Sequence, residues 1–412
     1  MIKIDKKTLI VSSWAPPKLG GAQNLYNIFS NIDSADYSIL TSRQNFTGKN
    51  GKLGLKLGCE YFFYGQETGG IAKESFYFIK RFPVFFKIVK NALFLVKFLF
   101  VGLMSTIKIL KVGEYVGKNK EVDLLMGLSD DELNLFSTFI LSKKLKKPFV
   151  VYLFDLYLGN QLNFPYNIIA RAVEPIIFKK ARHIIVTNDA TKEYYIKKYG
   201  NAEKYSVIYN SAFPKKYAEN ILLTRNSKKT NIVFTGNINW PQESSLNDLL
   251  ELISKSNEST INIAVYCPSP PVNLVKQYKD DKNIIFTFAS QAEMPRIQSE
   301  ADILFLPISW HTSSPDIVKT ASPGKLTDYL IAGKPILIYA PEYSFVTRYA
   351  KENNFAEIVN KKDQNMLKGA IEKLINNKEY ANLLVTNAKK TFYKHHDAVD
   401  NAIKLQKIIN NL

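Results

Sequence analysis

Short apolar runs alternate with longer stretches of helical periodicity along almost the whole chain. The runs are rich in Val, Ile and Phe and are bounded by polar or turn-forming residues, which is typical of buried strands. Their alternation with helices is typical of parallel α/β sheets. We expect a first series of strands at 8–13, 37–42, 60–65, 123–128, 149–154, 183–187 and 205–209, and a second at 231–236, 261–267, 283–288, 302–307 and 335–339.

The two series predict two domains, because 412 residues are too many for one typical domain and suffice for two. We expect a first domain over residues 1–212, a polar and charged linker over 213–230, a second domain over 231–391 and a terminal helix over 392–412. Two doubly wound domains would face each other across a cleft at the carboxyl ends of their strands, where ligands bind in such sheets.

The charge of the chain narrows the choice of partners. A formal net charge of +18 favours anionic partners: nucleotide phosphates, nucleic acid or an anionic membrane. No recognition module or basic stripe supports nucleic acid, so we do not expect it as a partner.

The cysteines and histidines argue against a disulfide framework and a metal centre. Cys59 and Cys267 are far apart, and the four histidines form no metal-binding pattern. The apolar run near the amino terminus is too short for a secretion signal. We therefore expect a reducing, cytoplasmic location and no metal cofactor.

The most informative stretch of the sequence is residues 321–339. It begins Ala-Ser-Pro-Gly-Lys-Leu-Thr-Asp-Tyr and continues through a glycine that would end a helix into an apolar run that predicts a buried strand. The stretch predicts a turn, a short helix and a strand. At the start of that helix, free N–H groups and Lys325 would bind an anion. Asp328, one turn later, is placed to accept hydrogen bonds from a ribose. Phosphate donors beside a ribose acceptor indicate a nucleotide-diphosphate site, although an ordinary helix–loop–strand unit has the same outline.

This stretch resembles the donor-site motif of GT-B glycosyltransferases, in particular the retaining enzymes that build bacterial surface polysaccharides. Their motif often reads S-P-x-K-x-x-E-Y-x-x-x-G-K-P. The matching positions are Ser322, Pro323, Lys325, Tyr329, Gly333, Lys334 and Pro335. The chain departs from the family at Asp328, where the family has glutamate, at Thr320, where it has another glutamate, and at Asn237, where it often has arginine.

A second loop resembles the family at Gly20 and Gly21, which follow the first predicted strand as in the family's P-x-x-G-G loop opposite the donor pyrophosphate. Adjacent glycines let a backbone approach a ligand closely, although flexible turns contain them as well. The resemblance implies a donor-binding second domain and an acceptor-side first domain. The donor-binding residues that it implies are Gly20, Gly21, Gly236, Asn237, Ser290, Thr320, Ser322, Pro323, Gly324, Lys325 and Asp328.

Two residues are catalytic candidates. Asp155 ends a hydrophobic predicted strand, where a carboxylate would point at a ligand and serve as base or charge stabiliser. Aspartate is also a preferred helix cap, and both interpretations stay open. His311 lies in a predicted loop before the donor motif and could donate to a sugar or phosphate, or could simply be exposed.

Residues 76–112 are apolar and basic without a single acidic residue. Spanning a bilayer takes about 20 mostly apolar residues, and Lys97 interrupts this stretch. We expect an interfacial segment that docks on an anionic membrane. The alternative is a core helix whose lysines reach outward to water.

The resemblance implies a fold of two Rossmann-like, doubly wound domains facing across a cleft (GT-B). It also implies a metal-independent, retaining transferase that moves a sugar from a nucleotide-diphosphate donor to a lipid-linked or glycan acceptor. The expected location is the inner face of the plasma membrane. Two alternatives remain: a catalytically silent partner subunit and a nucleotide-sugar epimerase.

Overall fold

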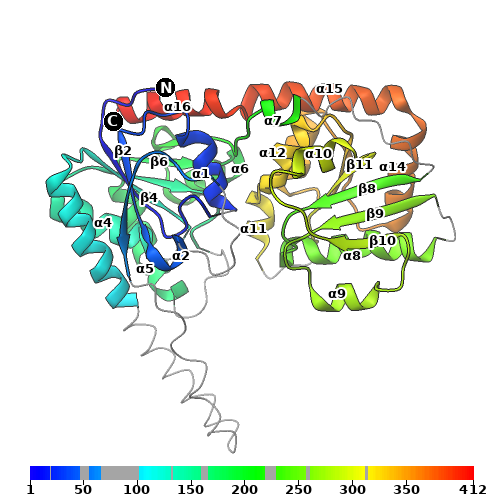
Figure 1. Cartoon of the computed structure of the whole chain (residues 1–412), viewed down its shortest axis with the longest axis horizontal. Coiled ribbons are helices and arrows are strands. Elements are labelled where there is room, and N and C mark those ends of the chain that lie inside the picture. Colours follow the sequence, from blue (N-terminus) through cyan, green and yellow to red (C-terminus); the bar gives the residue numbers. More distant parts are fainter. Residues whose placement is uncertain are drawn as a thin grey trace, which may run out of the picture. The chain divides into compact units, whose positions relative to one another are not determined.

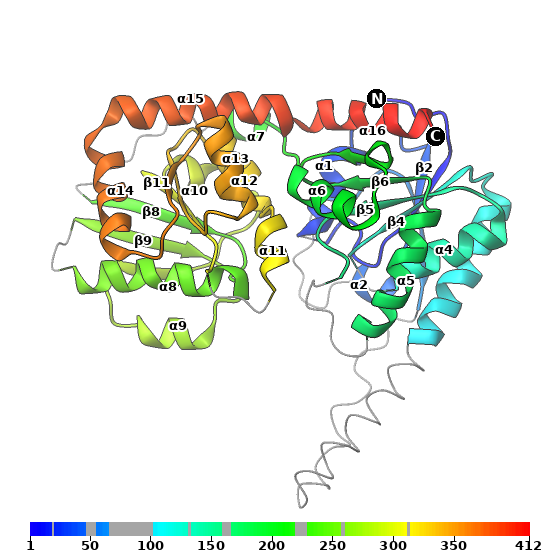
Figure 2. The same cartoon turned by 180° about the vertical axis from the view of Figure 1, so that it is seen from behind.

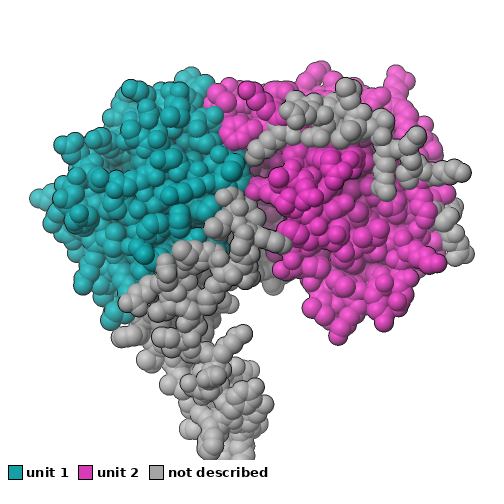
Figure 3. All heavy atoms as spheres, viewed as in Figure 1, with its two compact units in different colours: residues 1–208, 402–412 teal, residues 209–401 magenta. Residues whose placement is uncertain are grey.

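A computed structural model describes the chain apart from Leu19 and residues 47–54, 66–101, 131–132, 159–165, 219–228, 257–259 and 311–313. The chain divides into two compact units, one of Met1–Ile208 with Ala402–Leu412 and one of Tyr209–Asn401 (Figure 3). Each unit contains one parallel sheet, of seven strands in the first and six in the second. The prediction of two doubly wound α/β domains is confirmed. Of the stretch expected as a linker, residues 213–218 belong to the second unit, and most of the rest lies outside the described residues.

The first sheet has the strand order β3-β2-β1-β4-β5-β6-β7. Every one of its strands lies where the sequence pattern predicts it. They are β1 (Thr8–Val11), β2 (Tyr37–Ser42), β3 (Glu60–Tyr64), β4 (Leu124–Leu128), β5 (Phe149–Leu153), β6 (His183–Val186) and β7 (Tyr205–Val207). The strand order reverses between β1 and β4, and sheets of this kind bind ligands at the carboxyl ends of the strands beside such a reversal.

Helices cover both faces of this sheet, because successive strand residues point to opposite sides. Leu9 and Val11 pack with α4, α5 and α6, whereas Ile10 packs with α1 and α16. Figure 2 shows α4 and α5 side by side on their face of the sheet. The helices are α1 (Gly21–Phe29), α2 (Arg43–Phe46), a helix over residues 102–119, α4 (Asn134–Leu145), α5 (Tyr166–Lys180), α6 (Asp189–Tyr199), the 3₁₀ turn Ala202–Lys204 and α16 (Ala398–Asn410).

The second sheet has the order β10-β9-β8-β11-β12-β13. Its strands are β8 (Thr230–Thr235), β9 (Ile261–Tyr266), β10 (Ile284–Thr287), β11 (Ile303–Pro307), β12 (Ile336–Tyr339) and β13 (Glu357–Val359). Only β13 was missed by the sequence pattern. It has three residues and begins with a glutamate, so it shows no apolar run.

The helices of the second unit surround this sheet (Figure 1). The buried side chains of α8, α9 and α14 form one continuous core with β8 and β9. The helices are α7 (Lys215–Ala218), α8 (Trp240–Lys255), α9 (Val272–Gln277), α10 (Met294–Ser299), α11 (Pro315–Thr320), α12 (Gly324–Ile331), α13 (Phe345–Asn353), α14 (Gln364–Asn376) and α15 (Lys378–His395).

The carboxyl-terminal segment is two helices rather than the single one expected over 392–412. α15 ends at His395 and α16 begins at Ala398. At the start of α16, the Asp397 carboxylate accepts a hydrogen bond from the Val399 N–H at 2.8 Å. The last turn of α16 packs on the first residues of the first unit. There the Lys6 ammonium donates to the carbonyl of Ile409 at 3.1 Å.

The proposed membrane segment, residues 76–112, lies mostly outside the described residues. Its described part belongs to the helix over residues 102–119. That helix buries Ile109 in the core and exposes Leu103. None of the helices that the structure describes combines the length and the apolar character needed to cross a bilayer.

The helix over residues 102–119 packs closely on α4 through two glycines one turn apart, Gly113 and Gly117. A Cβ at Gly113 would lie 2.6 Å from Leu141 Cδ2 and 3.2 Å from Leu40 Cδ2. The absence of a side chain is therefore what lets the helix approach both α4 and the sheet.

We predict that Gly113→Ala lowers the melting temperature although alanine favours helices. Overpacking costs about 1–3 kcal/mol, whereas the gain in helix propensity is at most about 1 kcal/mol. The matched control is Gly369→Ala in α14, where a Cβ would meet no atom within 4 Å. This control should raise the stability by about 0.5–1 kcal/mol. Calorimetry of both variants tests the pair, and a gain in stability at Gly113 would refute the close packing.

Candidate functional site

In the second unit, the candidate site is built around the turn that follows β8. β8 ends at Thr235, and Gly236 follows with φ +96°, a conformation that favours glycine. A Cβ at Gly236 would lie 3.4 Å from Lys325 Cε and 3.7 Å from Lys325 Nζ. These are ordinary van der Waals distances, so the positive φ is what calls for glycine here, and the lysine side chain lies directly beside the turn. Gly236 and Lys325, which the resemblance to GT-B glycosyltransferases assigned to one donor site, are therefore in contact.

The start of α12 lies next to this turn. Pro323 precedes the helix, and within the described part of the chain no side chain caps its first turn. The turn before it is held by Asn210, whose side-chain amide donates to the Ser322 carbonyl at 3.0 Å. A Cβ at Gly324 would meet nothing within 4 Å. The Leu326 N–H donates to the Pro323 carbonyl at 2.9 Å, so the uncapped N–H groups at this helix start are those of Gly324 and Lys325, a geometry that suits an anion.

Lys325 carries the charge at this site. Its Nζ lies 3.5 Å from the centroid of the Phe234 ring. The Nζ is buried and has no hydrogen-bond partner among the described residues. Loss of water lowers the pKa of Lys325 well below its ordinary value, and the nearby Cys267 opposes the shift only in part. Burying a cation whose only contact is the face of an aromatic ring costs folding free energy. A bound anion would supply the missing hydrogen-bond partner.

A buried chain of hydrogen bonds fixes the end of β8 beneath this lysine. The Thr235 N–H donates to the Tyr329 hydroxyl at 2.9 Å, and the Gln298 amide donates to the Thr235 hydroxyl at 3.1 Å. The Tyr217 hydroxyl donates in turn to Gln298 at 2.8 Å. Tyr329 sits one helical turn after Lys325, so the network ties α12 to the sheet and holds the lysine in place.

Asp328 faces this network. Burial raises the pKa of Tyr217 well above its ordinary value, and the charge of Asp328 and a hydrogen bond to it add to the shift. The carboxylate thus lies next to a buried phenol contributed by α7. Its expected contact with a ribose stays a prediction. Tyr217 and Gln298 were missed by the sequence, because they come from distant helices and belong to no motif.

Of three other predicted donor residues, two hydrogen-bond to residues close to them in the sequence and the third is exposed. The Thr320 hydroxyl is engaged within α11, where it donates to the Asp316 carbonyl at 2.7 Å. Ser290 donates from its backbone and its hydroxyl to one oxygen of Glu293, at 2.8 and 2.6 Å. Asn237 is exposed beside Gly236. The structure therefore brings Gly236 and Lys325 together, and gives Thr320 and Ser290 local hydrogen bonds.

In the first unit, Gly20 and Gly21 begin α1. Gly20 has φ +84°, which favours glycine, and it supplies no side-chain cap. A Cβ at Gly21 would lie 3.3 Å from Phe154 Cδ2. Both glycines are exposed. The positive φ of Gly20 and the close approach of Phe154 to Gly21 account for the two glycines, and their contact with a diphosphate stays a prediction.

Asp155 directly follows β5 and Phe154. Desolvation by the surrounding protein raises the pKa of its carboxyl, although part of the residue is exposed. Two hydrogen bonds hold the loop that follows Asp155. The Tyr157 N–H donates to the Tyr195 hydroxyl at 2.9 Å, and the Leu158 N–H donates to buried Glu174 at 3.2 Å. No described helix begins at Asp155, so the described structure gives the cap interpretation no support. The other catalytic candidate, His311, lies outside the described residues.

A polar cluster at the carboxyl ends of β1 and β4 was missed by the sequence. Asp130 accepts hydrogen bonds from the Ser12 hydroxyl, from the Trp14 N–H at 3.0 Å and from the Asn134 amide. These hydrogen bonds fix the loop after β1 and leave Trp14 45% exposed, with Lys18 Nζ 5.5 Å from its ring centroid. The two aspartates after the strand predicted at 123–128 could have signalled this cluster.

The described residues contain no group of three or more His, Cys, Asp or Glu side chains that could hold a metal ion.

Comparison with known proteins gives structural relatives only, since no family model and no curated protein matches the sequence. The chain is similar to a sucrose-phosphate synthase from Thermosynechococcus elongatus, with a TM-score of 0.70, 12% identity, and coverage of 100% of this chain and 99% of that one. It is similar to Anabaena HepE in complex with UDP-glucose, with a TM-score of 0.67, 12% identity, and coverage of 99% and 100%. It is also similar to WaaG, a glycosyltransferase involved in lipopolysaccharide biosynthesis, with a TM-score of 0.62, 13% identity, and coverage of 98% and 100%.

The similarity to these three structures covers 98–100% of this chain. TM-scores of 0.62–0.70 show a shared architecture, and at 12–13% identity the similarity shows the fold alone. The chain has the GT-B fold, with two Rossmann-like domains, that these glycosyltransferases have.

Proposed function

We propose that the chain is a glycosyltransferase that takes a sugar from a nucleotide-diphosphate donor. The single observation that carries this proposal is the buried Lys325 ammonium, unpaired among the described residues, beside the open start of α12. A diphosphate would accept hydrogen bonds from both and would neutralise the lysine. The fold adds support, since HepE has been crystallised with UDP-glucose and with UDP.

The proposed chemistry needs no metal. The diphosphate becomes the leaving group when the sugar departs, and its growing negative charge would be stabilised by Lys325 and the helix start. Asp155, whose carboxyl has a raised pKa, would act as base toward the acceptor or stabilise an oxocarbenium-like transition state. Asp328 would bind the ribose. Retention of the anomeric configuration is part of the proposal by resemblance.

For the acceptor we propose a lipid-linked sugar or glycan at the inner face of the plasma membrane. Trp14 supports a sugar acceptor, because an exposed tryptophan ring held at the carboxyl end of β1 offers an apolar face to a sugar ring. WaaG, which has the same fold, is involved in lipopolysaccharide biosynthesis. Docking through residues 76–112 remains part of this proposal, along with an anionic membrane as partner.

Two other functions fit the same fold: a catalytically silent partner subunit and a nucleotide-sugar epimerase. A silent subunit would bind the nucleotide and turn over no donor. An epimerase would scramble the sugar of a free nucleotide sugar. Incubating the protein with UDP-glucose separates all three when two products are followed, with and without added glycan acceptors: release of UDP indicates a transferase, and a changed sugar in the recovered nucleotide sugar indicates an epimerase. Absence of any turnover across a panel of nucleotide sugars would sink the transferase proposal.

We predict that Lys325→Met weakens UDP binding by about 1.5–3 kcal/mol, the value of a charged hydrogen bond. The same change should leave the melting temperature at pH 7 equal or higher, since it removes a buried charge while keeping the apolar contact with Phe234. Lys276→Met, which removes an exposed charge from α9, is the control and should change neither. Calorimetric titration and thermal unfolding provide the two measurements. Unchanged UDP affinity would remove Lys325 from the site.

The lowered pKa of Lys325 also predicts a pH dependence. Between its folded pKa and the ordinary value of 10.5, the unfolded chain binds more protons at this residue than the folded chain does. This lysine therefore makes the free energy of unfolding rise with pH across that window. Lys325→Met should lose that contribution. An identical pH slope in parent and variant would contradict the burial of the charge.

We predict that Asp155→Asn lowers turnover by roughly 10²–10⁴-fold with little change in UDP affinity, because the amide can neither take a proton nor carry the charge. Steady-state rates and UDP titration of the same preparation give the comparison. Full turnover in this variant would leave Asp155 without a catalytic role.

A further inference from the structure

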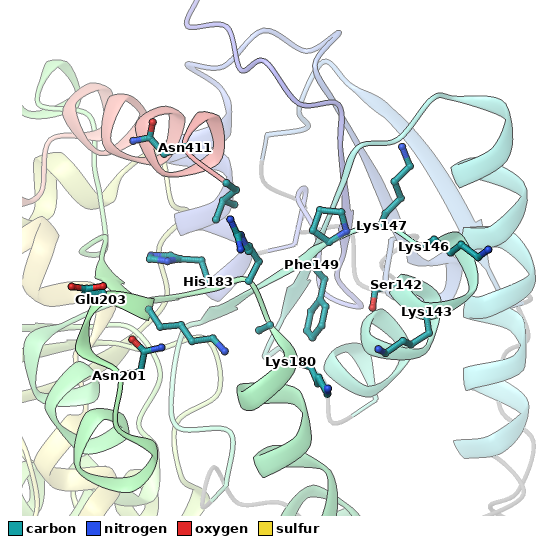
Figure 4. A pocket seen from close by; sticks show the side chains of 15 residues that line it. Ser142, Lys143, Lys146, Lys147, Phe149, Lys180, His183, Asn201, Glu203 and Asn411 are labelled. Carbon is teal, nitrogen blue, oxygen red and sulfur yellow. The ribbon is translucent and has the colours of Figure 1, made fainter.

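A basic hollow lies in the first unit, away from the residues assigned above. It encloses about 980 Å³ and is lined by six basic residues against one acidic residue, Glu203. The basic residues are Lys143, Lys146, Lys147, Lys180, Arg182 and Lys204. In Figure 4, Lys143, Lys146 and Lys147 come from the end of α4 and the turn after it, and Lys180 and Asn201 come from the other side of Phe149.

The hollow lies at the amino-terminal edge of the first sheet. Its residues immediately precede β5, β6 and β7, which begin at Phe149, His183 and Tyr205. Asp155 and the Asp130 cluster follow the carboxyl ends of β5 and β4, so the strands themselves separate them from the hollow. A strand of five residues spans roughly 16 Å. The hollow is therefore a different place from the edge where a doubly wound sheet binds its substrates.

Only part of this charge is used by the protein. Lys147 pairs with Asp123 at 3.5 Å, and the Lys204 ammonium donates to the carbonyls of Phe178 and Lys179 at 2.6 and 2.9 Å at the end of α5. Within the described residues, no ion pair or hydrogen bond engages the charged groups of the remaining four basic residues, which are Lys143, Lys146, Lys180 and Arg182.

Helix ends do not explain these four cations, of which only Lys143 has a ring contact among the described residues, with its Nζ 5.9 Å from the centroid of the Phe139 ring. α4 and α5 both finish at the hollow, and each helix end carries about half a negative charge. Together they call for about one positive charge, and Lys204 already lies on one of them. Like charges that gather in a concave surface repel one another, and a bound anion would relieve that repulsion.

We propose that this hollow binds a compact, soluble compound bearing several phosphate groups. Lysine ammonium groups and an arginine fork suit phosphate oxygens, and cations on two sides of the hollow suit a ligand with more than one phosphate. The site is independent of the proposed donor site and of the transferase reaction.

The surroundings favour a small polyanion over a macromolecule. Single-stranded nucleic acid binds to exposed aromatic faces, but Phe149 is only 3% exposed. A bilayer surface calls for exposed apolar side chains beside the charges. None of the large apolar side chains that are exposed elsewhere in the described structure lines the hollow.

The test uses the full chain and inorganic tripolyphosphate as the probe. The hollow variant combines Lys146→Ala, Lys180→Ala and Arg182→Ala, all exposed residues whose removal leaves the core untouched. We expect calorimetric titration to show the parent binding tripolyphosphate and the variant binding it at least about tenfold more weakly, since each lost charged hydrogen bond is worth about a factor of ten or more.

The matched control combines Lys3→Ala, Lys197→Ala and Lys407→Ala, exposed lysines of the same unit that lie outside the hollow and outside residues 76–112. It removes the same charge and should keep the affinity within about twofold. Equal loss in the two triple variants would mean non-specific attraction and would overturn the proposal. So would a parent that does not bind the probe, or binding that is lost in Lys325→Ala and kept in the hollow variant, because the probe would then occupy the proposed donor site.

A second measurement locates the probe on the unmodified protein. His183 lines the hollow, and its imidazole hydrogen-bonds the Ser206 hydroxyl at 2.8 Å. Its NMR signals, assigned with His183→Gln, should shift on adding tripolyphosphate, while those of buried His396 should not. The same variants are tested against phosphatidylglycerol vesicles and a single-stranded oligonucleotide. If the hollow variant loses either of those while the parent ignores tripolyphosphate, the surface docks a membrane or nucleic acid and the proposal falls.

Discussion

The charge of Lys325 is the constraint on which the second unit's site depends. A lysine at the edge of a sheet normally reaches water, yet here its ammonium rests on the face of the Phe234 ring. Beside it, Gly236 turns the chain at the end of β8 with a positive φ that favours glycine. The turn at Pro323 then aims the uncapped start of α12 at the same place. Each of these features is unfavourable or neutral alone, and together they would preorganise the anion site proposed above.

In the proposed site, the buried ammonium would lower the stability of the folded protein and raise its affinity for an anion. An unpaired buried ammonium raises the free energy of the folded protein, and a ring face compensates only in part. The buried hydrogen bonds among Thr235, Tyr329 and Gln298 make the end of β8 and the adjoining α12 rigid, next to the destabilising charge of Lys325. A rigid site keeps its donors in place before the ligand arrives, so binding energy is not lost to ordering side chains. Sites of this kind are where a sequence departs from what stability alone would select.

The architecture was readable from the sequence because buried parallel strands leave a local signal. Strands such as β5 and β12 are uninterrupted apolar runs between turns, and their positions follow from composition alone. β13 has only Ile358 and Val359 as apolar residues, and no local pattern marks it. The motif residues Gly236 and Lys325 were found for a similar reason, since their turns and helix start are local features.

The rest of the candidate site depends on contacts between distant parts of the chain. Tyr217 reaches Gln298 across 81 positions, and Ser12 reaches Asp130 across 118. No spacing rule anticipates such pairs, because they are set by which helix packs on which strand. Thr320 illustrates the opposite case: its place in the motif was visible, but its hydroxyl is engaged by its own helix. A motif fixes which residue stands at a position, and only packing decides what it faces.

The first unit places opposite chemistry at the two edges of one sheet. Asp130 and Asp155 follow the carboxyl ends of β4 and β5, whereas the basic hollow precedes the amino ends of β5, β6 and β7. Strand dipoles are small, so the sheet itself does not impose this sorting. Helix ends contribute, because α4 and α5 finish at the basic edge and attract cations there. Their partial charges account for one of the cations at most, and Asp123 pairs with Lys147. An excess of +18 spread evenly over the surface would repel itself far less than one concentrated in a hollow. The concentration of charge, rather than its total, is what distinguishes a binding surface from a basic composition.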